Sequence, residues 1–87
     1  MSREALLRAL DEAIAAARRL AAGGVVDQDR LQQLVAELTA RRAEVVAGHE
    51  LDREWAGRTV RWVAEWLPDG ELPLLARLGA IVRAAAP

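Results

Sequence analysis

The sequence predicts an all-α protein, and three observations support this class. Apolar residues recur at intervals of three and four along most of the chain, which is the spacing of amphipathic helices. No segment shows the strict apolar–polar alternation of half-buried strands. Glycine and proline divide the chain into four such segments. We therefore predict one domain over 1–87, an antiparallel four-helix bundle with helices at about 3–22, 28–47, 51–67 and 72–86.

The first helix is predicted to cover about 3–22. Ser2 is a candidate N-cap, and Gly23-Gly24 supplies a C-terminal stop. Its apolar face, at helical spacing, consists of Leu6, Leu10, Ala13, Ala17 and Leu20.

The second helix is predicted to cover about 28–47, with Asp27 as N-cap and Gly48 as its end. Val26 and Leu31 are spaced to form a hydrophobic staple at its start. Its buried face consists of Leu31, Leu34, Val35, Leu38, Val45 and Val46.

The last two helices are separated by a turn. The third, at about 51–67, ends where Pro68 disfavours helix in the residue before it. Asp69-Gly70 is a turn signal, and the fourth helix follows at about 72–86.

The composition limits the classes of partner. Twelve basic and thirteen acidic side chains give a net charge of −1, so we expect no nucleic-acid partner. The first residues are charged throughout, and no segment approaches the ~18–20 apolar residues that span a bilayer. We therefore expect a soluble cytoplasmic protein with no membrane partner. Every basic residue is Arg, which favours the codon usage of a high-GC bacterial genome and leaves selection for forked Arg pairs as the alternative.

The only aromatic residues are Trp55, Trp62 and Trp66. Their spacing of i, i+7 and i+11 places them within roughly 40° of one another on a helix. One interpretation is core packing, in which Trp62 and Trp66 face the small side chains of 13–17 in the first helix. The other is a contact surface, because Trp is enriched at protein interfaces.

Two further features favour self-association. The third helix extends its apolar arc to roughly 180°, wider than a surface helix needs. The residues that widen the arc are Ala56, Val60, Val63 and Leu67. The fourth helix carries only Arg77 and Arg83 as charges. We therefore predict a homodimer that buries the fourth helix and part of the third.

Arg42 points close to the middle of the apolar stripe of the second helix. Its guanidinium could stack on Trp55. It could also form a forked pair with Glu54 or Asp52, and would then anchor an anionic ligand or a partner's carboxylate. The alternative is that its methylenes follow the core edge and its charge reaches solvent.

Catalytic and metal-binding patterns are weak. His49, Glu50, Asp52 and Glu54 cluster before the third helix, but acids at a helix start are expected from its dipole alone. The chain has one His, no Cys or Tyr, and no nucleotide-binding signature. We predict no metal and no cofactor. The sequence favours a non-enzymatic protein, and carboxylate acid–base chemistry in a pocket stays open as the alternative.

Two functions follow as hypotheses. The leading one is a non-enzymatic interaction or assembly module, adaptor-like or regulatory. Its predicted contact residues are Trp55, Trp62, Trp66, Val60, Val63, Leu67 and Arg42. The alternative is a bundle that binds a small apolar molecule in a Trp-lined core pocket, with Arg42 as its polar contact and a capacity for weak acid–base chemistry.

Overall fold

The computed structural model describes residues 3–85, apart from the side chain of Asp69. Its elements are α1 (Arg3–Gly23), α2 (Gln28–Val46), α3 (Arg53–Trp66), the 3-10 turn η1 (Asp69–Glu71) and α4 (Leu72–Ala85). The described range contains no strand, so the predicted all-α class and four-helix bundle are confirmed. Every helix end within this range lies within two residues of its predicted position. The predicted cap Ser2 and the predicted last residue Ala86 lie outside the described residues.

Local signals set these helix ends. The Asp27 carboxylate caps α2 by accepting a hydrogen bond from the backbone N–H of Arg30 at 3.1 Å. Asp52 caps α3 in the same way, by accepting a hydrogen bond from the backbone N–H of Glu54 at 2.9 Å. Gly24 and Gly48 follow α1 and α2 with φ of 72° and 97°, a conformation that L side chains rarely adopt.

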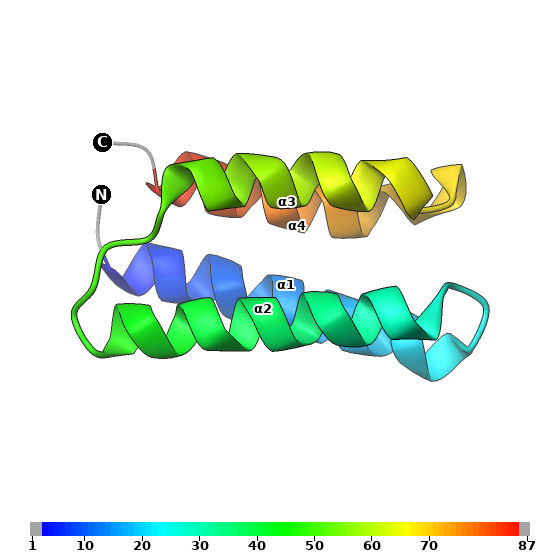
Figure 1. The fold of residues 1–87 in the computed structure, drawn as a ribbon, viewed down its shortest axis with the longest axis horizontal. Coiled ribbons are helices and arrows are strands. Elements are labelled where there is room, and N and C mark those ends of the chain that lie inside the picture. The colour runs from blue at the N-terminus through cyan, green and yellow to red at the C-terminus, as the bar shows by residue number, and fades with distance from the viewer. Residues whose placement is uncertain (1–2, 86–87) are drawn as a thin grey trace.

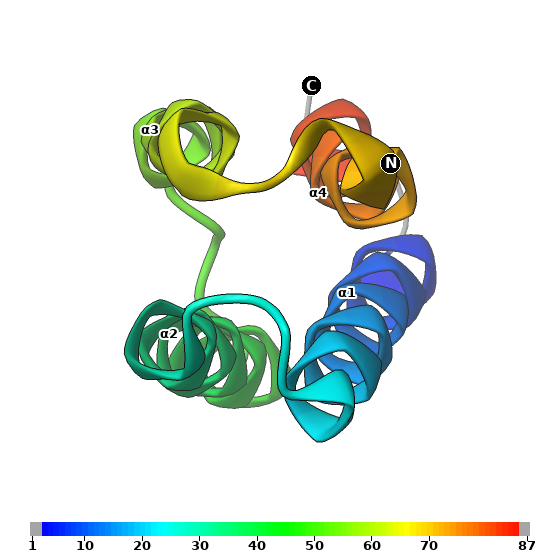
Figure 2. The ribbon, with the colours of Figure 1, turned by 90° about the vertical axis from the view of Figure 1, so that its right-hand side faces the viewer.

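The helices form an elongated bundle of 35 × 19 × 17 Å. Each helix starts at the end of the long axis where the previous helix stops (Figure 1). Seen end-on, the helices occupy the corners of a square (Figure 2). α1 packs directly on α2 and α4, and α4 packs on α3. In the described part of the chain, no Cα atom of α2 lies within 8 Å of one in α3.

Side-chain size accounts for the unequal sides of this square. The distance between packed helices depends on the side chains at the contact. α1 buries mainly small residues, which allow its two neighbours to approach closely; these are Ala9, Ala13, Ala16 and Ala17. The side between α2 and α3 instead holds tryptophans and long polar side chains. That side is therefore the widest one.

Most of the apolar surface of α3 and α4 that was predicted to need a second subunit is buried within the single chain. Ala56, Val63 and Leu67 are buried, because α4 packs over this side of α3. α4 also buries its own core residues Leu74, Leu78 and Ile81. The apolar edge expected to need a second subunit therefore belongs largely to the core of one chain.

What remains exposed on α4 is its outer side, where Leu72 keeps 63% of its surface accessible. Among residues 3–85, no helix combines the length and apolar character that crossing a membrane requires.

Candidate functional site

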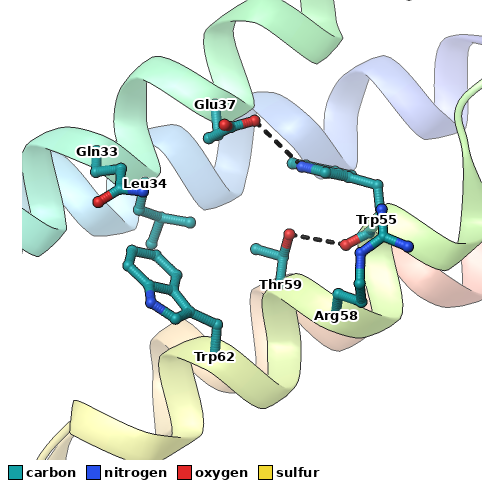
Figure 3. A pocket seen from close by; sticks show the side chains of 7 residues that line it. All are labelled: Gln33, Leu34, Glu37, Trp55, Arg58, Thr59 and Trp62. Carbon is teal, nitrogen blue, oxygen red and sulfur yellow. Dashed lines mark hydrogen bonds between the residues drawn. The ribbon is translucent and has the colours of Figure 1, made fainter.

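The tryptophans of α3 line the wide side of the bundle. Trp55 donates its indole N–H to the Glu37 carboxylate of α2 at 3.3 Å. The Trp62 ring lies beside Leu34, also on α2 (Figure 3). The expectation that Trp62 faces 13–17 of α1 is therefore wrong. α1 and α3 stand at diagonal corners of the bundle, and their backbones do not meet in the described structure.

A hollow of about 190 Å³ opens between α2 and α3. We call it the Trp groove, and its lining residues are Gln33, Leu34, Glu37, Trp55, Arg58, Thr59 and Trp62. Trp55 and Trp62 stand on two sides of it, while Glu37 reaches in from the opposite helix (Figure 3). Apolar rings with a few polar groups are the usual lining of ligand sites. The volume is below the roughly 300 Å³ at which typical ligand pockets begin, so the groove suits one small chemical group.

Arg41, and not Arg42, stacks on Trp55. The Arg41 guanidinium carbon lies 5.7 Å from the indole centroid, within the range of a cation–π contact. Arg41 also pairs with Glu44 at 3.4 Å. Arg42 forms an ion pair with Asp11 of α1. Successive helical residues point about 100° apart, so Arg41 is directed toward α3 and Arg42 toward α1.

The other predicted partners of Arg42 are also wrong. Asp52 and Glu54 pair with Arg58, at 3.9 and 3.6 Å. The Arg42 side chain is 42% exposed and borders a shallow hollow on the α1–α2 surface. Arg42 therefore reaches solvent, as the alternative interpretation expected, and it is not part of the Trp groove.

The groove contains one carboxylate without a cationic partner. Glu37 accepts a hydrogen bond from a neutral indole, and no cation in the described range lies within 4 Å of its oxygens. Arg41 and Arg58, the nearest candidates, are paired with other acids. The uncompensated charge in the groove is therefore negative.

Thr59 forms the floor of the groove between the two indoles (Figure 3). Its hydroxyl donates to the Trp55 carbonyl at 2.8 Å, one turn earlier in α3, and the residue is buried. Sequence reasoning missed Thr59 and all the groove residues of α2. The available signal was a polar row at helical spacing beside the apolar stripe of α2, formed by Arg30, Gln33, Glu37 and Arg41.

Trp66 continues the stripe beyond the groove. Its ring packs edge-on against Trp62, with centroids 5.2 Å apart and planes at 70°. The buried Trp66 indole N–H has no acceptor among the described residues.

The predicted contact residues thus fall into three groups. The tryptophans and Val60 are only partly buried. Val63 and Leu67 lie in the core, and Arg42 lies on another face.

The fold and groove define a small helical bundle with a lateral aromatic groove. Among residues 3–85, no three His, Asp or Glu side chains are grouped so that they could hold a metal ion. Comparison with known proteins gives no match to any family, curated protein or solved structure. Function must therefore be argued from the groove itself.

Proposed function

We propose that this chain is a non-enzymatic interaction module, an antiparallel four-helix bundle that forms a homodimer through the Trp groove. The supporting observation is that Trp55, Trp62 and Trp66 share one edge of α3 and remain only half-buried in a single chain. Covering apolar surface contributes about 25 cal/mol per Å², and Trp offers more such surface than any other residue here. Association at this edge would therefore gain more than association elsewhere.

A second copy suits this edge electrostatically. The net charge of −1 produces little repulsion between copies. Along α2, Glu37 and Arg41 are one turn apart and carry opposite charges. A two-fold axis crossing α2 near residue 39 would bring Glu37 of each copy opposite Arg41 of the other. Such a contact is self-complementary, as a symmetric dimer requires.

Sedimentation equilibrium over a concentration series tests this proposal. We expect the average mass to rise toward that of a dimer. Trp62→Gln should weaken the association by at least about tenfold, as truncation of an interface Trp does. Leu72→Gln is the matched control, because it removes an exposed apolar side chain from α4. Circular dichroism verifies that both variants remain helical.

Two outcomes would overturn the proposal. A wild-type chain that stays monomeric at the highest concentrations would remove the homodimer. Dissociation by Leu72→Gln but not by Trp62→Gln would move the interface to α4. Independently of any variant, the wild-type Trp emission should shift to shorter wavelength as concentration rises.

Binding of a small molecule is the second candidate, and the hollow beside Trp55 and Trp62 favours it. Its volume of about 190 Å³ exceeds the roughly 150 Å³ that accommodates benzene in an engineered cavity. Glu37 and Gln33 supply the polar contacts here, in place of the predicted Arg42. Ligand-dependent quenching of Trp emission at concentrations where the chain is monomeric would distinguish this candidate from assembly. The cytoplasmic location and the acid–base chemistry stay predictions from the sequence.

A further inference from the structure

We infer that the Trp groove recognises a guanidinium group. The inference deepens the proposed function and rests on its premise that this groove is the binding surface. Three properties of the groove point to this chemistry: its unpaired carboxylate, its two indoles and its size.

The unpaired carboxylate of Glu37 favours a cation, because Arg58, the cationic residue of the lining, is already paired with Asp52 and Glu54. Glu37 uses one carboxylate oxygen, Oε2, to accept the Trp55 indole N–H, and its Oε1 has no partner among the described residues. The Gln33 side-chain amide on the same lining also has no partner in that range. A donor-rich cation can bond to both groups, whereas an anion would meet the Glu37 charge at close range.

The aromatic walls select a flat cation. Trp55 and Trp62 flank the hollow, and Thr59 closes the floor between them (Figure 3). Guanidinium is planar, weakly hydrated and stacks on aromatic faces while donating to a carboxylate. The chain already contains one such contact, because Arg41 lies over the Trp55 ring. A compact, strongly hydrated ammonium would use the indole walls less well.

The hollow has room for a guanidinium head with a short alkyl stem, and it is open to solvent on one side. A hollow of about 190 Å³ is slightly larger than one that holds benzene. Two sources present this group: a free alkylguanidinium, or an arginine of a second copy. All twelve basic residues are Arg, so a second copy can offer no other side-chain cation apart from its single His.

A pair of isosteric probes tests the inference. N-methylguanidinium and N-methylurea have similar shapes, but only the first is charged. We would titrate each into the wild-type chain at concentrations where it is monomeric, with ionic strength held constant by sodium chloride. The readouts are Trp emission and the NMR signals of the three indole N–H groups. We expect saturable binding of N-methylguanidinium that shifts the Trp55 signal, and much weaker binding of N-methylurea.

Glu37→Gln isolates the charge, because Gln keeps an acceptor for the Trp55 indole. It should weaken N-methylguanidinium binding by about two- to fivefold, as loss of one partly exposed charge pair does. Glu65→Gln is the matched control. Glu65 is an exposed carboxylate of α3 outside the groove, and its replacement changes the net charge equally.

The outcomes separate this inference from the proposed function. Equal binding of both probes, or equal effects of the two variants, would overturn guanidinium recognition. If the chain dimerises through Trp62 while N-methylguanidinium neither binds the monomer nor dissociates the dimer, the inference fails and the homodimer stands. If the probe dissociates the dimer, the natural source is an arginine of the second copy. If it binds a chain that never dimerises, the source is a free ligand.

Discussion

Two glycines inside helices provide a sharp stability prediction. Gly57 lies within α3 and Gly79 within α4, where glycine costs roughly 0.5–1 kcal/mol relative to alanine. A Cβ added at Gly57 would come no closer than 3.6 Å to another heavy atom, the Nη1 of Arg61. At Gly79 the nearest is Arg83 Nη1 at 3.5 Å. Both distances are ordinary contacts with the mobile end of a side chain.

Alanine therefore fits at both positions and should stabilise the chain. Each replacement should raise the free energy of unfolding by about 1 kcal/mol. The glycines lie on different helices and their added Cβ atoms would contact different side chains, so their effects should add to about 2 kcal/mol. For a domain of this size, each kcal/mol corresponds to a rise in Tm of about 4–8 °C.

Urea unfolding followed by circular dichroism measures these changes at concentrations where the chain is monomeric. Gly48→Ala is the matched control, because φ at Gly48 is +97°. A side chain is strained there whatever the space around it, so we expect this variant to lose about 1 kcal/mol.

A loss of stability in Gly57→Ala or Gly79→Ala would refute the reasoning, because it would mean that these glycines are needed for packing. Gly79 also allows a test between copies. If Gly79→Ala stabilises the monomer but weakens a dimer, another chain approaches α4 at this point.

Three further predictions concern the surface ion pairs, the core and a helix cap. Asp11→Asn and Glu12→Gln remove half-exposed ion pairs to Arg42 and Arg77, respectively. Double-mutant cycles with these arginines should give a coupling energy of less than about 1 kcal/mol for each pair. Leu38→Ala, at a fully buried position, should lower the free energy of unfolding by about 2–5 kcal/mol in the same assay. Asp27→Ala removes the side-chain cap of α2 and should cost about 1 kcal/mol, whereas Asp27→Asn should retain most of it; equal losses in both would show that the cap hydrogen bond is not the cause.

The helix ends were predictable because each depends on a few neighbouring residues. Asp27 caps its own helix through a contact three residues away. Gly24 and Gly48 take a backbone conformation that other residues disfavour, and this is a property of glycine itself. Pro68 disfavours helix in the residue before it, Leu67, which is extended as expected. None of these effects requires knowledge of the tertiary structure.

The site was not predictable in the same way. Its composition depends on which helices are neighbours, and helical periodicity does not specify this. Placing Trp62 opposite 13–17 assumed that α1 and α3 meet, whereas they stand diagonally. The second wrong prediction concerned which of two adjacent arginines faces Trp55. Arg41 and Arg42 differ by about 100° in direction, which is enough to assign the cation–π contact to the wrong arginine.

The groove and the packing of the bundle have one common cause. Three sides of the square are closed by direct helix packing, and the acids Asp11 and Glu12 of α1 reach α2 and α4 respectively. The α2–α3 side is joined instead by side-chain contacts, including those of Trp55 with Glu37 and Arg41. Indoles are too large to let the two helices pack as closely as the alanines of α1 allow. The same residues therefore hold this side apart and line the space that results, so a ligand stacked between them would reinforce the side of the bundle with the least backbone contact.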